Sequence, residues 1–499
     1  IGNCGGTASV FNIVAAAMQK HPTLKGRVCG PNTLNTDPAV TWYATIKNNV
    51  DIINTHQLAG TFDHLIEFWQ TGKNDGKRAV ADEMHNVLEA MVAMNYGAEY
   101  GTWWGYEGVT RAEFANITTN GRQLTYKEDL TNFAVAGVYR YDSEPDRAKA
   151  IIGTSERQAT PTNFNFISQD RLAYFDGYGP AYDYMMDVPG GTGYQNGQTN
   201  AERTINLYSG EDVPVEPVNG QYKIVNKASG KVLSLPNGDA TIRQSIYQWA
   251  DGELANQAWD VYPINKKNSA DYSYVVIRNA NTSTFPLYLD ATAWAMDKGA
   301  KVNVWSDGDD LSTLPNGWQR WYLDYVGNGY YHVINHDTGL YLAVDGGSTA
   351  NGANVIEWDN DGSDKLLWKF LPVDHSIDAT APTTPTGLAA TPQSGAVKLT
   401  WVPNSDADVY GYMVYRYNAT AGIWECIGRK VRGTAFLDNT CRKGQSLRYR
   451  IRALDKAYNL SEPSAEVQAQ TTSGKAMIAQ WIGLSSKDNT PNKMHAVAN

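Results

Sequence analysis

The stretch LYLDATAWAMDKGAKVNVWSDGDDLSTLPNGWQRW, residues 287–321, is the middle copy of a unit that occurs three times between residues 222 and 371. Each copy has a Leu-rich segment, then a segment ending in a tryptophan, and it closes on a second tryptophan: Trp249 and Trp259, Trp305 and Trp321, Trp358 and Trp368. A repeat of about 50 residues is one supersecondary unit that cannot bury its apolar face alone. Three such units predict a closed β-trefoil over residues 217–374, with the repeated tryptophans in a shared core.

A short signature precedes the closing tryptophans. It reads Asn256-Gln257-Ala258-Trp259 in the first copy, Gln319-Arg320-Trp321 in the second and Leu366-Leu367-Trp368 in the third. The first two resemble the Gln-x-Trp signature of ricin-type β-trefoil lectins, whereas the third copy has lost the Gln. The resemblance implies a shallow sugar pocket in each copy. Its parts are an Asp after the Leu-rich strand, a polar residue two positions before the middle aromatic residue, and the Asn or Gln before the closing Trp.

The second copy keeps most of these pocket positions, namely Asp290, Asn303, Trp305 and Gln319. The first copy has Ser234 in place of the Asp, and the third has Ala343 and Ile356. A carboxylate accepts hydrogen bonds from sugar hydroxyls, and an indole face covers the apolar face of a sugar ring. The resemblance therefore assigns a carbohydrate pocket to the second copy. In the alternative interpretation, Trp305 and Gln319 serve only the scaffold.

Length and composition bound the other choices. A chain of 499 residues suits three or four domains. The net charge of −10 and the lack of a run of five basic residues argue against nucleic acid and anionic membranes as partners. No stretch of 18 apolar residues occurs, so we expect no membrane span. The 15 Trp and 30 Tyr beside only 42 Lys and Arg are typical of secreted carbohydrate-active proteins. We therefore expect a secreted or cell-surface protein of bacterial origin.

Residues 1–142 alternate short apolar segments with amphipathic ones. This pattern predicts strands over 27–31, 51–57, 78–83 and 101–105, and helices over 8–20, 38–49, 62–71, 87–94 and 126–139. Strand–helix alternation indicates parallel βαβ units. An eight-stranded β/α barrel needs about 250 residues, so this part predicts the second half of a barrel. We expect the first half as preceding sequence or as a separate chain, because half a barrel leaves two open sheet edges.

Two further modules are predicted outside the barrel segment and the trefoil. Short alternating segments between Gly, Pro and Asn turns indicate a small β-sandwich over 143–216. After a linker rich in Thr, Pro and Ala, residues 384–472 contain Trp401 and the strands 412–415 and 449–453. These features resemble a fibronectin type III domain, whose core holds a buried Trp and a late Tyr. Such modules are usually spacers, so we assign it no chemistry.

The four cysteines neither demand nor exclude disulfides. Cys426 and Cys441 lie in one module and are able to pair, and Cys4 with Cys29 is the other pairing considered. No Cys/His cluster has the spacing of zinc ligands, and we expect neither a metal nor a cofactor. The tail at 473–499 has no assignment.

Four short motifs in the N-terminal part resemble the second half of clan A glycoside hydrolases, which are retaining enzymes on a β/α barrel. The motifs are Gly2-Asn3-Cys4, Asn54-Thr55-His56, Ala81-Asp82-Glu83 and Trp103-Trp104. The resemblance implies that Glu83 is the nucleophile. It also implies that Asn3 and His56 bind the reacting sugar, with Trp104 as the floor. Cys4 stands where the family has its acid/base glutamate.

Cys4 puts the activity in question. Retaining hydrolysis needs two carboxyl groups about 5–5.5 Å apart, one as nucleophile and one as proton donor. A thiol has an ordinary pKa near 8.5 and is a poor proton donor to a glycosidic oxygen, and loss of a general acid costs roughly 10²–10⁴-fold in rate. Three explanations stay open: the module binds glycan without cleaving it, Glu107 or Asp82 supplies the proton, or the alignment of the first residues is shifted.

The sequence therefore predicts a multidomain protein, part α/β and part all-β, that acts on a polysaccharide or another glycan. The leading hypothesis is an extracellular retaining glycoside hydrolase whose trefoil keeps it near its substrate. The alternative is a non-catalytic surface glycan-binding protein built on a decayed hydrolase barrel. An interaction scaffold without a sugar site is the third hypothesis.

Overall fold

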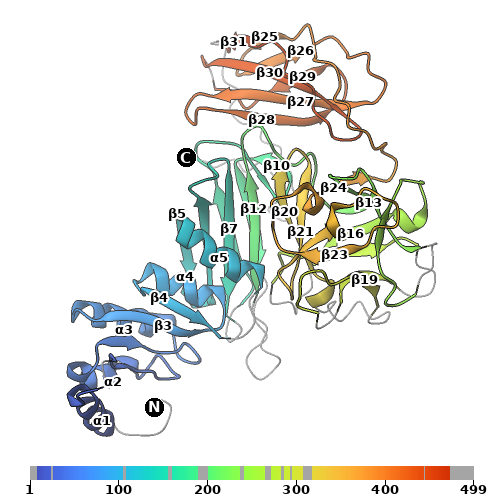
Figure 1. Ribbon diagram of the computed structural model, residues 1–499. Helices are drawn as coiled ribbons and strands as arrows, with labels where there is room; N and C mark the ends of the chain where they lie inside the picture. Colours follow the sequence, from blue (N-terminus) through green and yellow to red (C-terminus); the bar gives the residue numbers. More distant parts are fainter. Residues whose placement is uncertain are drawn as a thin grey trace.

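The computed structural model describes residues 8–23, 26–104, 108–155, 160–188, 201–236, 241–264, 271–281, 286–292, 295–306, 317–442 and 444–472. Figure 1 shows an N-terminal part with helices around a small sheet, a central β-sheet, a β-trefoil beside it and a C-terminal β-module. Strands dominate the described residues, and none of the helices among them is long and apolar enough to cross a membrane.

The N-terminal part is a four-stranded parallel sheet in the order β1-β2-β3-β4. Its strands are β1 (Cys29–Pro31), β2 (Ile52–Asn54), β3 (Arg78–Met84) and β4 (Tyr100–Trp103). Its helices are α1 (Ala8–Lys20), α2 (Ala39–Ile46), α3 (Phe62–Asn74), α4 (Val87–Asn95) and α5 (Val109–Asn120). Asn86 caps α4 by accepting a hydrogen bond from the Glu89 N–H, which fixes where that helix begins. The described strands follow chain order and form an open sheet.

The prediction of a helix over 126–139 is wrong. These residues belong to two strands, β5 (Gly121–Asp129) and β6 (Ala134–Tyr141). β6 is buried on both faces, with Val135 and Tyr139 in the core under the helices and Ala134 in the core on the opposite face. A strand covered on both faces shows no alternation of polar and apolar residues. Its continuous apolar run therefore resembles a buried helix.

β5 and β6 join a six-stranded sheet in the order β10-β9-β12-β7-β6-β5. The other strands of this sheet are β7 (Arg147–Thr154), β9 (Ala173–Phe175), β10 (Tyr178–Ala181) and β12 (Glu202–Tyr208). A separate pair, β8 (Thr162–Ile167) and β11 (Asp183–Val188), packs on one face, and α4 and α5 cover the other. The sheet thus begins at Gly121, within the range 1–142 predicted for the barrel segment.

The repeat region forms the β-trefoil that the sequence predicts. Its strands are β13 (Gly220–Asn226), β14 (Val232–Ser234), β15 (Tyr247–Trp249), β16 (Trp259–Pro263), β17 (Val275–Asn279), β18 (Tyr288–Ala291), β19 (Val302–Trp305), β20 (Trp321–Gly327), β21 (Tyr330–Asn335), β22 (Tyr341–Val344), β23 (Val355–Trp358) and β24 (Trp368–Pro372). β13 pairs with β24 and so joins the first copy to the third. The prediction of a trefoil is confirmed.

The closing tryptophans show why the three copies fold alike. Their side chains are fully buried, and each indole N–H donates to a main-chain oxygen of its own copy: Trp259 to Leu233 over 2.9 Å, Trp321 to Leu289 over 2.9 Å and Trp368 to Leu342 over 2.8 Å. A buried indole needs such a partner, since an unpaired polar group in a core is costly. The same hydrogen bond therefore locks the Leu-rich strand of each copy to the closing Trp.

The C-terminal module consists of two sheets, in the orders β25-β26-β29 and β28-β27-β30-β31. The strands are β25 (Ala389–Gln393), β26 (Ala396–Thr400), β27 (Val409–Asn418), β28 (Ile423–Val431), β29 (Ala435–Asp438), β30 (Ser446–Asp455) and β31 (Val467–Gln470). Trp401 and Tyr449 lie together in its core, as the sequence predicts. The fibronectin type III family assignment stays a prediction.

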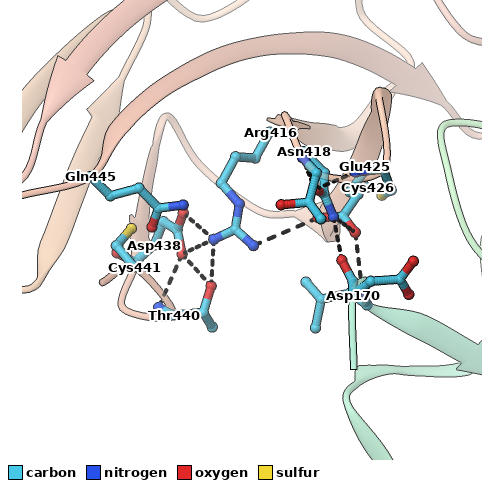
Figure 2. Close-up of polar contacts among 12 residues, drawn as sticks. Asp170, Arg416, Asn418, Glu425, Cys426, Asp438, Thr440, Cys441 and Gln445 are labelled. Atoms are coloured by element: carbon cyan, nitrogen blue, oxygen red, sulfur yellow. Dashed lines mark hydrogen bonds and ion pairs between the residues drawn. The ribbon is translucent and has the colours of Figure 1, made fainter. Parts of the chain in front are cut away.

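This module is docked on the central sheet, so its linker is not its sole connection to the rest of the chain. The Leu172 N–H donates to Glu425 Oε1 over 3.1 Å, and the Tyr174 hydroxyl donates to the Cys426 carbonyl over 2.8 Å. Figure 2 shows the adjoining contact, where the chain at Asp170 approaches Glu425 and its neighbours. These contacts are buried hydrogen bonds between two domains, and the role of the module as a spacer stays a prediction.

The cysteines do not pair in the described part of the chain. Cys426 and Cys441 are free thiols, so the pairing considered for them does not occur in this structure. Cys29 is also a free thiol, and burial together with the charge of Asp82 raises its pKa to about 12. Cys4 lies outside the described residues.

Candidate functional site

Polar side chains from neighbouring strands gather at the carboxyl edge of the parallel sheet. Asn54 ends β2 and His56 follows it, while Asp82 and Glu83 lie near the end of β3 and His85 follows that strand. The carboxyl ends of parallel strands meet at one edge, where β/α proteins build their ligand sites. The predicted site residues of both strands are therefore brought together.

Asp82 is held by donors from the adjacent strand. Its Oδ1 lies 2.8 Å from His56 Nε2 and also accepts a hydrogen bond from the Asn54 amide. The Asp82 N–H donates to Asn54 Oδ1 over 3.1 Å. Partial burial acts to raise the pKa of Asp82, but the hydrogen bonds from His56 and Asn54 hold it below its ordinary value. Asp82 is thus an ionised anchor for His56, which argues against its use as the proton donor.

Glu83 lies between two imidazole rings. Its Oε2 is 3.4 Å from His56 Nδ1, and its Oε1 is 3.5 Å from His85 Nε2. The Glu83 side chain is 21% exposed, so a ligand can reach it. Because Asp82 already engages Nε2 of His56, the ring is oriented with Nδ1 toward Glu83. A carboxylate that is oriented and accessible in this way can attack an electrophilic carbon or accept ligand hydroxyls.

An open indole face lies beside this carboxylate. Trp104 is 65% exposed, and its ring centroid is 6.5 Å from that of His85. The main-chain N–H of Trp104 donates to the Met84 carbonyl over 2.8 Å, which connects the end of β4 to the end of β3. Trp103 packs instead against the apolar core. Of the two tryptophans, Trp104 is therefore the one available to a ligand.

Three predicted residues of this site, Asn3, Cys4 and Glu107, lie outside the described residues, and their roles stay predictions. His85, which follows β3, is a residue of this site that the sequence analysis does not single out. A signal for it exists in the sequence, because positions 83 and 85 are two apart and side chains two apart on a strand share a face.

The trefoil pocket predicted in the second copy is a sheltered one. Asp290 and Asn303 are directly paired across the β18–β19 hairpin and are 3% and 8% exposed. The Asn303 amide donates to Thr292 Oγ1 over 3.0 Å. Residues 293–294, between the two strands, and residues 307–316, after the second strand, lie outside the described residues. The structure therefore brings two of the four predicted residues into direct contact.

The closing glutamines of the first two copies differ in their hydrogen bonds. Gln257 donates to Ser234 Oγ over 3.1 Å and to the Ala250 carbonyl over 2.9 Å, so it serves the scaffold. Gln319 is fully buried, and within the described part of the chain neither its amide nitrogen nor its oxygen has a hydrogen-bond partner. The same holds for Asn303 Oδ1. Buried polar atoms are normally paired, so these unpaired atoms distinguish the second copy from the first, whose Gln257 is fully engaged.

The aromatic platform of this pocket is partly covered. Trp305 is half-buried, and the guanidinium of Arg243 lies 4.9 Å from its ring centroid. A cation over an indole face is attracted by the ring electrons. A sugar ring would therefore take the face that Arg243 leaves open, or displace the guanidinium.

Comparison with known proteins defines the class of this domain. Residues 213–305 and 317–396 match the family model described as ricin-type beta-trefoil lectin domain-like. This part of the chain is thus a lectin-type β-trefoil. Among solved structures, the designed three-fold symmetric protein ThreeFoil is 25% identical and covers 32% of this chain and 100% of its own, with a TM-score of 0.27. The Rhizoctonia solani agglutinin is 22% identical, covering 32% of this chain and 99% of its own, with a TM-score of 0.26.

Two curated relatives are amylopullulanases. That of Thermoanaerobacterium saccharolyticum is 34% identical over 114 residues, which is 23% of this chain and 8% of the relative. That of Thermoanaerobacterium thermosulfurigenes is 33% identical over 136 residues, 27% of this chain and 7% of the relative. The chain thus spans less than a tenth of the length of either relative.

A solved exo-beta-1,3-galactanase of Clostridium thermocellum is also similar, at 17% identity over 50% of this chain and 57% of its own, with a TM-score of 0.27.

Proposed function

We propose that this protein is a retaining glycoside hydrolase that carries a carbohydrate-binding trefoil and acts outside the cell on a polysaccharide or another glycan. The observation that carries the proposal is the position of Glu83, an accessible carboxylate between two imidazole rings with an open indole face nearby. The amylopullulanase relatives and the match of the trefoil to a lectin family support a glycan as the ligand.

Each side chain of the edge has a role in this proposal. Glu83 Oε attacks the anomeric carbon, and the bond from that carbon to the leaving oxygen breaks. His56, oriented by Asp82, and Asn3 hydrogen-bond the reacting sugar. Trp104 supplies the apolar floor on which the sugar ring stacks.

A complete site needs more strands than the open sheet offers. We propose that four further strand–helix units, on preceding sequence or on a separate chain, close the sheet into a β/α barrel. Closure would bury the open edges of β1 and β4. Retaining chemistry also requires a proton donor within about 5–5.5 Å of Glu83, and because Cys4 stands at the acid/base position, this proposal needs another residue to supply that proton.

The alternative function is glycan binding without cleavage. It is favoured by the cysteine at position 4, where the resemblance places the acid/base residue. In that case the sheet edge binds a saccharide through His56 and Trp104, and Glu83 accepts hydrogen bonds from its hydroxyls.

The two functions are separated by replacing Glu83 with Gln and measuring release of dinitrophenol from a panel of dinitrophenyl glycosides. These leaving groups need no proton, so a missing acid does not hide the first step. We expect the parent to release dinitrophenol and Glu83→Gln to lose roughly 10³-fold or more in rate.

Glu99→Gln is the matched control. Glu99 lies in the loop before β4, and its half-exposed carboxylate forms an ion pair with Arg78. It should match the parent. No release by the parent, assayed together with the units that close the barrel, would reject the hydrolase in favour of glycan binding, and equal release by Glu83→Gln would remove Glu83 as the nucleophile.

A further inference from the structure

The candidate site lies at the carboxyl edge of the parallel sheet. The starts of the two helices that follow β3 and β4, namely α4 and α5, are held by residues of other domains. Glu202 begins β12 in the central sheet, is 2% exposed, and accepts a hydrogen bond from the Val87 N–H over 2.6 Å. Val87 is the first residue of α4 and lies two positions after His85. A buried carboxylate of the central sheet thus binds the start of α4, the helix that follows β3.

Arg111 extends this contact to the site itself. Its Nε donates to both oxygens of Glu202 over 3.1 Å, and its terminal nitrogen donates to the His85 carbonyl over 2.5 Å. The His85 N–H donates to Glu89 Oε2 over 2.8 Å. The main-chain N–H and carbonyl of His85 are therefore both fixed, and with them the ring that lies 3.5 Å from Glu83.

The trefoil holds the second segment. Asp271 is 2% exposed, and its Oδ2 accepts from the Thr110 N–H over 2.9 Å. The Tyr274 hydroxyl accepts from the Val109 N–H over 2.6 Å. These are main-chain donors of the first turn of α5, which have no partner within the helix. Because α5 carries Arg111, the trefoil sets the position of the guanidinium that holds His85.

The two anchors are joined to each other. The Tyr272 N–H donates to the Glu202 carbonyl over 2.8 Å, and Glu202 and Asp271 form an isolated parallel bridge. The ion pair between Arg111 and Glu202 is buried, with side chains 9% and 2% exposed. Burying charges is expensive, and apolar residues would join two domains at least as well. The charges therefore point to a role in fixing the geometry of the groups they hold.

We propose that Glu202 and Asp271 are positioning residues that fix the orientation of the His85 ring relative to the Glu83 carboxylate. The central sheet and the trefoil are then both part of the framework of the active site. The geometric claim stands on the contacts of His85, and its consequence for catalysis rests on the proposed hydrolase function. Glu202 and Asp271 each act through Arg111 and the main chain.

The test uses the full chain labelled with ¹³C-histidine, in which eight ring signals are expected. His85→Asn and His64→Asn assign two of them. We expect Glu202→Gln and Asp271→Asn to move the His85 signal and to alter its response to pH. The His64 signal, from a half-exposed ring paired with Asp37, should stay in place.

Glu211→Gln is the matched control. Glu211 also joins two domains through ion pairs, with Arg450 and Arg452, but it lies away from the His85 contacts. It should leave the His85 signal unchanged. An unmoved His85 signal in both Glu202→Gln and Asp271→Asn would overturn the proposal.

Arg111→Lys keeps the test decisive if a carboxylate variant fails to fold. Lysine retains the charge but cannot make the forked contact with Glu202 while reaching the His85 carbonyl. We expect it to move the His85 signal while near-ultraviolet circular dichroism stays native. A folded Arg111→Lys protein with an unmoved signal would refute the positioning role.

Kinetics on the dinitrophenyl glycosides then test the catalytic consequence. Glu202→Gln and Asp271→Asn should lower kcat by roughly 10- to 100-fold with KM nearly unchanged, and Glu211→Gln should match the parent. If the parent hydrolyses nothing, the proposed function fails, while the histidine signals still decide the positioning claim. If the signals move and kcat does not, His85 has no part in the reaction and the catalytic consequence is rejected.

Discussion

Two adjacent carboxylates at the end of β3 have different environments. Asp82 is engaged by His56 and Asn54, whereas Glu83 faces the second nitrogen of His56 and a second imidazole at contact distances of 3.4 and 3.5 Å. The His56 ring therefore lies between Asp82, which anchors it, and Glu83, the proposed nucleophile. This division of roles follows from hydrogen bonding, because the two residues are chemically similar and neighbours in the chain.

At the same scale, the carbohydrate pocket predicted in the second trefoil copy is tested through its one buried carboxylate, Asp290. Asp290→Ala should weaken retention on the best ligand of a glycan array by roughly tenfold or more, because a hydrogen bond to a charged group contributes about 1.5–3 kcal/mol.

Asp359→Ala is the control for that experiment, since Asp359 is an exposed aspartate of the third copy that pairs with Lys298. Its retention should equal that of the parent. Unchanged retention after loss of Asp290 would remove this pocket from the carbohydrate-binding role.

The sequence predicts which residues lie at the carboxyl edge of the parallel sheet better than it predicts the contacts among them. Glu83, His56 and Trp104 are assigned from short motifs, and the structure places them at one edge. The part of Asp82 as anchor of His56 was not predicted. It depends on Asn54, which lies 28 positions away and meets Asp82 only when β2 and β3 run in parallel.

The trefoil repeats allow a comparison of equivalent elements. Gln248 and Glu357 occupy the same register position, each opposite a leucine of the preceding strand. Each accepts a hydrogen bond from a hydroxyl, Gln248 from Ser229 over 2.6 Å and Glu357 from Thr338 over 2.5 Å. Gln248 also donates to two carbonyls. An ionised Glu357 cannot donate, and in the described part of the chain its Oε2 has no hydrogen-bond partner.

This difference predicts that Glu357→Gln stabilises the trefoil in a pH-dependent way. Burial raises the pKa of Glu357 to about 7 from an ordinary value of 4.5. The unfolded chain therefore ionises first, and the parent loses stability as pH rises from about 4.5 to about 7, after which the loss is constant. The variant should gain roughly 2–3 kcal/mol over the parent at pH 8 and little at pH 4.

Urea unfolding at the two pH values measures this difference, with the exposed Asp359→Asn as the control. An equal effect of Glu357→Gln at pH 4 and pH 8 would contradict the assignment of a buried, titrating carboxyl group.

Elements buried on both faces are the ones that the sequence misassigns. Strands with one solvated face alternate, and helices with one solvated face repeat every three to four residues. β6 has neither pattern, because α4 and α5 cover one face and β8 and β11 the other. The three trefoil copies are predictable for the opposite reason, since their closing tryptophans recur in register.

At the scale of the whole molecule, the domains form one connected body. The C-terminal module is held to the central sheet through Glu425, which is 1% exposed and accepts from the Leu172 N–H and from the Asn418 amide. Arg416 lies 3.7 Å from Glu425 and pairs with Asp438 over 2.9 Å (Figure 2). A single buried carboxylate therefore supports both the module and its docking surface.

Glu425→Ala should uncouple the module from the central sheet. It leaves the Leu172 N–H unpaired and weakens the environment of Arg416, at a cost of about 2–4 kcal/mol. We expect one cooperative thermal transition of this part in the parent to separate into two in the variant, measured by calorimetry. Glu462→Ala, at an exposed position of the same module, should leave the transition unsplit. A parent-like transition in Glu425→Ala would show that the docking does not depend on this residue.

Such docking cannot be read from local sequence. Leu172 and Glu425 are 253 positions apart, and nothing near either residue marks the other. A compact module after a linker rich in Thr, Pro and Ala gives no sign of docking, and the contact with the central sheet appears only in three dimensions.

The role of Glu83 is best tested by trapping the covalent intermediate. A 2-deoxy-2-fluoro sugar with a dinitrophenyl leaving group reacts slowly with the nucleophile to form a glycosyl ester. This ester is hydrolysed more slowly than it forms, so it accumulates on the protein. After proteolysis and mass spectrometry, we predict one added glycosyl group, located on Glu83 in the parent and absent from Glu83→Gln. A label on another residue, or no label while the trefoil still binds its glycan, would contradict the assignment of Glu83 as the nucleophile.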